Sequence, residues 1–418
     1  MRETKDLEFK EQVSKTFLKT VSAFANYGTG EIKFGIKDNG QVVGVDDPEM
    51  VCLDIENKIN DSIQPNPKYD LDIDKDTRVI TLRVYQGTNP PYFYKSKAYK
   101  RNDSASIEVD PVELSRLILE GKNQTFDSLQ AQDQNLTFSS LETALKDKLG
   151  IETLNQDILI TLDLLRKAKG YTNAGALLAD HNHFRGINLV RFGANLNIML
   201  DRKDYEGISV LDQYNLSVDM YRQYYQHEEI KGIKRELVEE IPEEAFREAV
   251  ANALVHRTWD VNSQIKISMF DDRIEIASPG GLPSGLSKEE YLLGQISILR
   301  NPILANVFYR LGLIEQFGTG IRRIISSYQG SVIQPKFKIF ENSIVIILPL
   351  LQSVPVNLSE DEGKIYQAVQ SGNETTSKIN GMVGFGRTKT LRLINSLVKK
   401  GYLIKVGEGR GTKYMLPK

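Results

Sequence analysis

Cysteine is almost absent from this chain, which has Cys52 as its single example among 418 residues. A single thiol excludes disulfides within the chain and zinc sites that need several cysteines. The sequence also has no long apolar run, and its first residues are charged, so we expect neither a membrane span nor a signal peptide. These absences favour a cytoplasmic protein without a membrane partner.

A phosphate loop of the form GxxxxGK[ST] is also missing from the sequence. That loop holds nucleotide phosphates in P-loop motors, so a helicase motor of this kind is excluded. The length exceeds what a single hydrophobic core organises and predicts about three domains.

Charge is balanced over the whole chain, with a formal net charge of −2, but it is not evenly distributed. From residue 359 to the end there are eleven Lys or Arg against five Asp or Glu. A basic module on an otherwise acidic chain suggests a polyanion as the partner of that module.

The first 120 residues show the pattern of an α+β unit. Apolar residues recur at helical spacing from Val13 to Ala25, and EIKFGI then alternates with Ile32, Phe34 and Ile36 on one face. The following KDNG predicts a hairpin turn, because Asn and Gly tolerate positive φ. The rest of the unit is expected to be a helix near 50–63, a strand in RVITLRVY and a helix over 111–119.

The remaining chain divides into three predicted parts. Residues 121–200 read as a polar linker and a mostly helical connector, and 201–352 as a second α+β domain. Residues 355–418 begin with a capping-box pattern, in which Ser359 stands three residues before Glu362.

The last part has three predicted helices and then the Gly-rich hairpin LIKVGEGRGTKYML, and it resembles bacterial winged-helix DNA-binding domains. Its third helix is expected to bury Leu391, Ile394, Leu397 and Val398. The cations expected to contact DNA are Arg387, Lys389, Arg392, Arg410 and Lys413. Winged helices also serve in protein docking and dimerisation, and this alternative stays open.

In the central part, Glu248 and Asn252 share one face of a predicted helix, upstream of PGGLPSG and GTG. The ordered segments EAVANALVHRTW, FDDRIEIASPGGLP and RNPILANVFYRLGLIEQFGTGIRRI resemble the GHKL-type ATPase domain, an α/β sandwich, of bacterial RecG-related proteins and transcriptional regulators. The resemblance implies ATP as a ligand, Glu248 as general base and Asn252 as magnesium ligand. It also implies two glycine boxes, at Gly280 and Gly281 and at Gly318 and Gly320.

The sequence departs from that family at one position. Ser278 stands where an Asp normally accepts the adenine amino group, and a neutral hydroxyl is the weaker and less selective acceptor. The alternative for this domain is therefore a scaffold or dimer interface that binds no ATP.

The N-terminal part resembles the AlbA-like domain of Schlafen proteins in LEFK, in SAFANYGTGEIKFGIKDNGQVVGV and in PYFYKSKAYKRNDSAS. This resemblance implies nucleic-acid binding and, in nuclease members, an acidic triad that matches Glu3, Glu8 and Asp38. Mg²⁺ or Mn²⁺ on such a triad would cleave RNA or DNA, with Lys10 beside the scissile phosphate. A stretch that mixes aromatic residues and cations would stack on bases and contact the backbone, through Tyr92, Lys95, Lys97, Tyr99, Lys100 and Arg101.

Spacing alone does not support the triad. Glu3 and Glu8 are five residues apart, so neither a helix nor a strand places both on one face, and Asp38 is explained by its turn. Two functions follow, and the acidic candidates favour the first over its alternative. The first is a Schlafen-like metal-dependent nuclease acting on RNA or single-stranded DNA, with a role in defence against phage. The second is an ATP-binding winged-helix transcriptional regulator without catalytic activity. A homo-oligomer is expected in either case, because the chain has one AlbA-like lobe.

Overall fold

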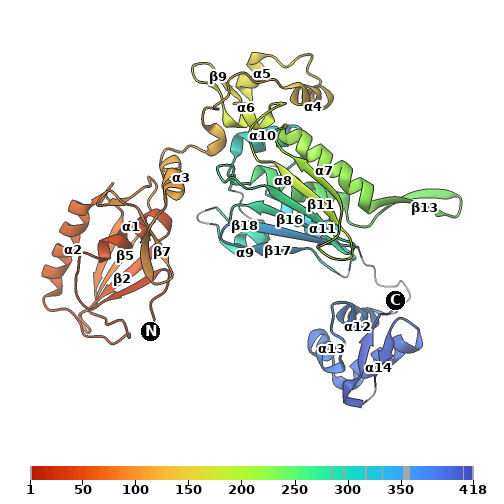
Figure 1. Ribbon diagram of the computed structural model, residues 1–418. Helices are drawn as coiled ribbons and strands as arrows, with labels where there is room; N and C mark the ends of the chain where they lie inside the picture. The colour runs from red at the N-terminus through yellow and green to blue at the C-terminus, as the bar shows by residue number, and fades with distance from the viewer. Residues whose placement is uncertain are drawn as a thin grey trace.

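The computed structural model describes residues 2–283, 286–294, 296, 298–315, 318–331, 333–351, 358–407 and 409–416 (Figure 1). It is a mixed α+β structure with an N-terminal α/β domain, a central domain on a mixed sheet and a C-terminal helical domain with a hairpin, as predicted. No described helix is long and apolar enough to cross a membrane.

The N-terminal domain is built on a four-stranded sheet of order β1-β2-β5-β4. Strands β1 and β2 are parallel, and the helix α1 that connects them buries its apolar side on the sheet. The predicted strand face is confirmed for Ile32 and Phe34, which are buried in the domain core, whereas Ile36 lies beyond the end of β2 and packs with Phe9 and Val79 in a separate cluster. The strands are β1 (Leu7–Lys10), β2 (Gly30–Phe34), β4 (Tyr69–Ile73) and β5 (Ile80–Val84), and the helices are α1 (Phe17–Tyr27), α2 (Pro48–Ser62) and α3 (Pro111–Gly121).

Short strand pairs complete this domain, namely β3 (Ile63–Gln64) with β6 (Phe93–Tyr94), and β7 (Tyr99–Asn102) with β8 (Ala105–Glu108). The KDNG turn closes as predicted, with the Gly40 amide donating to the Lys37 carbonyl at 2.7 Å. Its hairpin is shorter than expected, because Ile36 and Val42 form only an isolated bridge.

The central domain has a six-stranded sheet of order β12-β11-β15-β16-β18-β17. Helix α8 packs against β16 and β18, and α7 and α11 lie beside α8. The strands are β11 (Ile187–Phe192), β12 (Met199–Tyr205), β15 (Ile265–Met269), β16 (Arg273–Pro279), β17 (Lys336–Ile339) and β18 (Ser343–Pro349). The helices are α7 (Val210–Tyr225), α8 (Glu243–Val255), α9 (Lys288–Leu293), α10 (Pro302–Arg310) and α11 (Gly320–Ser327).

The predicted boundary at residue 201 is wrong, since it falls inside β12 and leaves β11 in the connector. The connector is not a separate unit either, because Leu141, Leu145 and Leu159 belong to the same hydrophobic core as the sheet. Its elements are η1 (Phe126–Ser128), α4 (Ser139–Leu149), α5 (Gln156–Thr161), β9 (Leu165–Arg166), β10 (Gly170–Tyr171) and α6 (Asn173–Leu178).

Two contacts connect the predicted polar linker and α3 to the central domain. The buried Asp127 carboxylate accepts from the amides of Ile303 and Leu304 at 2.8 and 3.1 Å and so caps α10. Arg116 on α3 donates to both carboxylate oxygens of Asp260, at 2.8 and 3.2 Å. These polar side chains therefore anchor the segment to the central domain, so it is not an unstructured spacer.

A two-stranded hairpin protrudes from the central domain between α7 and α8 (Figure 1). Its strands, β13 (Gln226–Lys231) and β14 (Lys234–Glu239), pair only with each other among the described strands. We call residues 226–239 the arm.

The C-terminal domain has the predicted order of three helices and a hairpin. The Ser359–Glu362 capping box at the start of α12 is confirmed, and the helices enclose a small core. On α14 the buried residues include Leu393, Ile394 and Leu397, whereas the predicted Leu391 and Val398 are half-buried at its margins. The elements are α12 (Glu360–Gln370), α13 (Thr376–Val383), α14 (Arg387–Lys399), β19 (Ile404–Val406), η2 (Gly409–Gly411) and β20 (Lys413–Met415).

Candidate nucleotide site and nucleic-acid surfaces

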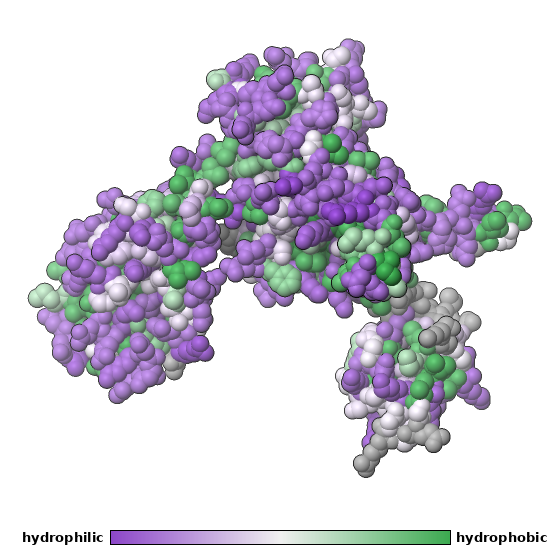
Figure 2. Space-filling model, in the orientation of Figure 1, coloured by the Kyte–Doolittle hydropathy of each residue, from purple (hydrophilic) through white to green (hydrophobic). Residues whose placement is uncertain are grey.

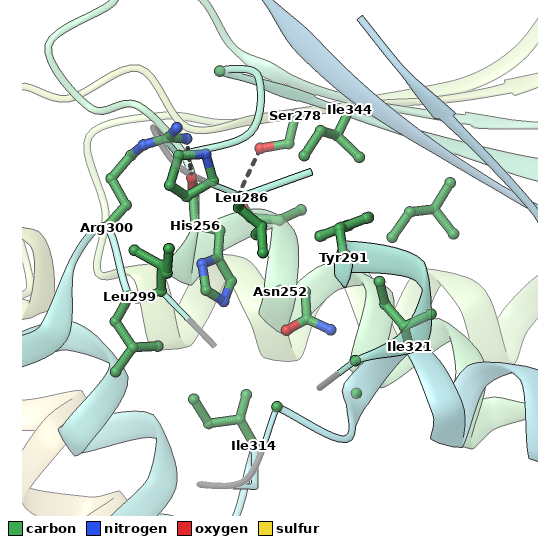
Figure 3. A pocket seen from close by; sticks show the side chains of 18 of the residues that line it. Asn252, His256, Ser278, Leu286, Tyr291, Leu299, Arg300, Ile314, Ile321 and Ile344 are labelled. Carbon is green, nitrogen blue, oxygen red and sulfur yellow. Dashed lines mark hydrogen bonds between the residues drawn. The ribbon is translucent and has the colours of Figure 1, made fainter. Parts of the chain in front are cut away.

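A cavity of about 1010 Å³, including its open mouth, lies between α8, the end of β16, α9 and the start of α11 (Figure 3). The seven residues predicted to bind nucleotide come from three separate segments, yet all of them line this one cavity. They are Glu248, Asn252, Ser278, Gly280, Gly281, Gly318 and Gly320.

Glu248 and Asn252 lie one helical turn apart on α8, and their side chains meet in the cavity. The Asn252 amide Nδ2 donates to Glu248 Oε1 at 3.1 Å. Burial raises the pKa of the Glu248 carboxyl, and Arg323 opposes this shift. A buried carboxylate with a raised pKa suits a proton acceptor, and the amide oxygen of Asn252 suits a hard cation.

The glycines allow close approach of the backbone. A Cβ on Gly320, the first residue of α11, would lie 2.3 Å from Glu248 Oε1 and 2.7 Å from Asn252 Nδ2. Gly280 has φ +110°, and a Cβ there would lie 2.1 Å from Thr258 Oγ1. The first turn of α11 lines the cavity, and no described side chain caps its N-terminus. Its free backbone amides are therefore suited to bind an anion.

Ser278 already has one hydrogen bond to the backbone. Its hydroxyl donates to the Ala253 carbonyl at 2.9 Å, as the dashed line in Figure 3 shows. Because the proton points to the backbone, the Ser278 oxygen can only accept from a ligand. An acceptor is what an amino group on a base requires, so the hydroxyl has the same polarity as the Asp that the GHKL resemblance implies at this position.

Several cavity residues were not predicted. Arg300 donates to the carbonyls of His256 and Gly281 at 2.8 and 2.9 Å, and so joins the end of α8 to the first glycine box. Burial, reinforced by Arg300, lowers the pKa of His256 to about 4, so its ring is neutral at physiological pH. Tyr291 and Ile314 add apolar wall. The only feature of the sequence that could have pointed to a role for Arg300 was its position directly before the Asn-Pro pair at the start of α10.

The acidic triad is not assembled, which corrects the sequence prediction. The described residues contain no group of three or more His, Cys, Asp or Glu that could hold a metal ion. Glu8 is buried and bonded to Arg101, to Thr20 Oγ1 at 2.6 Å and to Lys10 Nζ at 2.8 Å. Glu3 accepts from the Phe9 amide at 2.8 Å, and Asp38 is exposed in its turn. Lys10 therefore neutralises Glu8 in this structure.

The stretch of aromatic residues and cations is also used differently from the prediction. Tyr92 and Tyr99 are buried in the domain core, where they offer no free ring to a base. Lys97 pairs with Glu108 and Lys100 with Glu113, each at 2.7 Å. Arg101 is the buried partner of Glu8. Only Lys95 keeps its cation on the surface without a described carboxylate, lying over the Tyr94 ring.

In the C-terminal domain the cations predicted to contact DNA fall into two groups. Arg387 and Arg392 are exposed on α14 and form no ion pair with a described carboxylate. Lys389 pairs with Asp361, and Lys413 with Glu374, each at 2.7 Å. The side chain of Arg410 lies outside the described part of the structure. The exposed pair on α14 is therefore the best candidate for phosphate or base contacts.

Comparison with known families supports this domain arrangement. Residues 3–110 match the family described as "Schlafen, AlbA_2", and residues 262–348 match that described as "Putative ATP-dependent DNA helicase recG C-terminal". The chain therefore combines an N-terminal Schlafen AlbA_2 domain with a central domain that matches the C-terminal part of RecG-type proteins. We call the central domain the RecG-type domain. Helix α8, which carries Glu248 and Asn252, precedes the residues matched in the RecG-type domain.

Solved structures give weaker likenesses. The DIP2311 protein from Corynebacterium diphtheriae is 17% identical, with 99% of this chain and 95% of that chain covered at a TM-score of 0.47. The N-terminal domain of a "Putative ATP-dependent DNA Helicase RecG-related Protein" from Nitrosomonas europaea is 24% identical. It covers 25% of this chain and 83% of that chain at a TM-score of 0.20. The comparison with curated proteins finds no match.

The RecG-type cavity meets the chemical needs of a nucleotide. It combines a buried acid and amide pair, glycines at positions where a Cβ would collide, an uncapped helix start and apolar walls. The acid and amide pair suits a magnesium ion, the glycines and the helix start suit phosphates, and the apolar walls suit a base.

Proposed function

We propose that this chain is an ATP-binding regulator that binds duplex DNA through its winged helix. The observation that carries the proposal is the convergence of seven predicted residues, from three segments, on one cavity of the RecG-type domain. This convergence supports the proposal, because the resemblance implied it and spacing in the sequence did not.

The chain's own residues would divide the work as follows. Asn252 would hold the magnesium ion through its amide oxygen, while Glu248 fixes the amide orientation through the 3.1 Å bond. The start of α11 and the glycines would receive the phosphates, and Ser278 would accept from the amino group of adenine. Bound magnesium would neutralise the phosphate charge.

We propose regulation and not nucleic-acid cleavage because the acidic residues of the N-terminal domain do not converge on one site. Metal-dependent cleavage requires acidic groups that converge on an ion, whereas Glu8 is bonded to two cations and Asp38 is exposed on a turn. Cleavage stays an untested prediction, and incubation of the protein with structured RNA and single-stranded DNA in Mn²⁺ is the assay for it.

A binding titration with ATP and Mg²⁺ tests the proposal. We expect saturable binding by the wild type and at least tenfold weaker binding by Asn252→Ala, a loss of about 1.4 kcal/mol or more. Gly320→Ala should lose binding as well, because its Cβ would collide with Glu248 and Asn252. Gly381→Ala on α13 is the control, since no atom lies within 4 Å of a Cβ built at that position.

Equal and negligible binding by the wild type and Asn252→Ala would overturn the nucleotide assignment and leave the RecG-type domain as a scaffold. Duplex DNA binding by the Arg387→Ala, Arg392→Ala double variant, measured in parallel, tests the winged helix separately. Retention of full DNA affinity by that variant would overturn the assignment of α14.

A further inference from the structure

The arm carries apolar side chains that its own chain does not cover. Ile233 at its tip is fully exposed, at 100%, and Ile230 and Leu237 are 72% and 61% exposed. Figure 2 shows this hydrophobic surface at the end of the protrusion, away from the body of the central domain. An isolated two-stranded hairpin is at best marginally stable in water, and three or more strands are usually needed.

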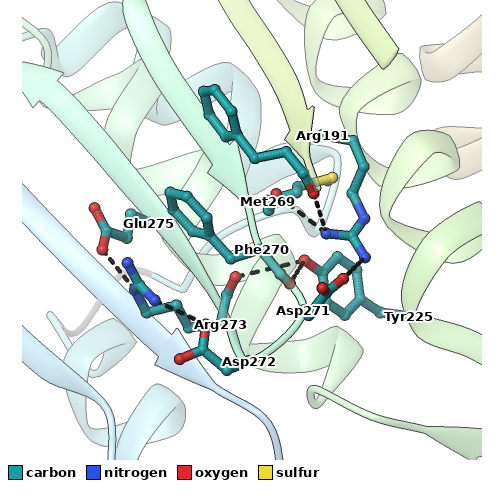
Figure 4. Close-up of polar contacts among 9 residues, drawn as sticks. Arg191, Tyr225, Met269, Phe270, Asp271, Asp272, Arg273 and Glu275 are labelled. Carbon is teal, nitrogen blue, oxygen red and sulfur yellow. Dashed lines mark hydrogen bonds and ion pairs between the residues drawn. The ribbon is translucent and has the colours of Figure 1, made fainter. Parts of the chain in front are cut away.

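The base of the arm is firmly held, so the arm extends in a defined direction. Tyr225, the last residue of α7, donates to the Phe270 carbonyl at 2.6 Å, and Arg191 pairs with Asp271 at 2.5 Å (Figure 4). Across the base, Gln226 donates to Glu243, whose amide donates to Glu239.

Each arm strand has one outer edge without a strand partner in the described chain. Such an edge presents backbone donors and acceptors that readily pair with a strand of another molecule. The question is therefore which strand would complete the sheet.

The sequence of β13 is complementary to itself. When two copies of β13 run antiparallel with Ile230 opposite Ile230 of the second copy, Glu229 lies opposite Lys231 of the other chain at two symmetric places. Like charges directly opposite each other destabilise a strand pair, and opposite charges stabilise it.

We propose that the arm is a dimerisation element, in which β13 pairs with β13 of a second copy of this chain. The pairing forms a four-stranded sheet of order β14-β13-β13-β14 across a two-fold axis at Ile230. Two strand edges are satisfied, Ile230 of one copy lies opposite Ile230 of the other, and the contact closes on itself as an isologous dimer.

Charge reversal tests this register in the full chain without nucleotide or DNA. The wild type should sediment at twice 47.2 kDa. Glu229→Lys alone and Lys231→Glu alone should each weaken the dimer at least tenfold, because like charges then meet across the axis. An equimolar mixture of the two variants should restore a dimer, because both cross-axis pairs are again opposite in sign.

The same single variants separate dimerisation from a purely local role. Any contact that Glu229 or Lys231 makes within its own arm is altered in each variant, and mixing the two variants changes nothing inside a single arm. A local role therefore predicts that mixing the two variants has no effect.

A change of apolar surface gives an independent readout. Ile230→Lys should also give monomer, because two cations would then meet at the two-fold axis. The matched control is Met50→Lys, at a 64% exposed site on α2, which should stay dimeric.

Three outcomes would overturn the proposal. They are a wild type that is monomeric at about 10 μM, a dimer that the arm variants leave intact, and a monomer whose nucleic-acid binding is lost on arm substitution. The last outcome would reassign the arm to nucleic acid.

Discussion

At the scale of single residues, the contacts of Glu8 in the opening segment show that this acidic side chain has a structural role. Glu8 has less than a tenth of its surface exposed and is bonded to Arg101, itself 8% exposed, so the pair is a buried ion pair. Removal of one partner leaves the other charge buried and uncompensated, which costs about 3 kcal/mol or more.

Glu8→Gln should therefore lower the free energy of unfolding of the AlbA_2 domain by about 3 kcal/mol. Asp38→Asn, from the same predicted triad, should change it by less than about 0.5 kcal/mol, because Asp38 is exposed. Chemical denaturation, monitored through hydrogen exchange in α1, would measure both changes in the free energy of unfolding. Equal effects of the two substitutions would contradict the assignment of Glu8 as a structural residue.

His256 makes the stability of the central domain depend on pH. Its folded pKa, about 4, lies below the ordinary value of 6.5, so protons bind the unfolded state more tightly. The stability that neutral His256 contributes is complete above pH 6.5 and is lost as the pH falls towards 4.

Replacement by a residue that does not titrate should remove this loss. His256→Asn should be less sensitive than the wild type between pH 6.5 and 4, by up to about 3 kcal/mol at the acidic end of the window. Thermal unfolding of the central domain across this range is the measurement. Parallel pH curves for the two proteins would refute the assigned shift.

At the scale of elements, the C-terminal domain depends on one carboxylate that connects two helices. Glu362, near the start of α12, accepts from Ser396 Oγ at 2.7 Å and Lys400 Nζ at 2.8 Å, at the end of α14. Lys400, followed by the Ser359 amide and Ser396, lowers the pKa of Glu362 to about 2. This contribution to stability is present above the ordinary glutamate pKa and is lost as the pH falls towards 2.

Glu362→Gln should therefore reduce amide protection in α12 and α14 at neutral pH while leaving α8 unchanged. A loss of about 1–2 kcal/mol is expected, since a charged hydrogen-bonding group is removed from its partners. The control is Glu360→Gln, whose carboxylate is 86% exposed. Hydrogen exchange read by mass spectrometry resolves the helices separately, and an equal loss in all three would contradict the prediction.

Elements with strong local signals were predictable from the sequence. The alternation of Ile32 and Phe34, the Ser359 capping box and the helix near 50–63 all appear, because each follows from backbone and side-chain preferences within a few residues. The connector was not predictable in this way. Asp127 reads as a linker residue until α10, about 175 positions later, presents its amides to it.

Among the candidate site residues, those covered by a family pattern were also predictable, and those defined only by the fold were not. The glycines and the Glu248–Asn252 pair were found because a family pattern supplied the long-range pairing that spacing could not. Arg300 was missed because its role, bridging two backbone carbonyls, leaves no mark in the sequence. In the AlbA_2 domain the pattern misled, because aromatic residues that alternate with cations also describe a strand with a buried face, such as Tyr99 and Arg101 on β7.

At the scale of the whole molecule, the base of the arm lies beside Leu350 and Leu351, the last described residues before the gap that precedes the C-terminal domain. The Leu351 amide donates to the carbonyl of Glu240, the residue that follows the arm, at 2.6 Å, and the Leu350 amide donates to the Asp272 carbonyl at 3.0 Å. Two chains joined through their arms would therefore start both of their winged-helix connections from symmetry-related points.

Such a molecule would read its DNA as a palindrome. If the proposed arm pairing and winged-helix function both hold, DNA selected from a random pool by the wild type should contain inverted half-sites at a fixed spacing. Lys231→Glu should select isolated half-sites with lower affinity. Isolated half-sites from both proteins would mean that the winged helices bind DNA independently. Pairing of the arms would then not determine the spacing or symmetry of the DNA site.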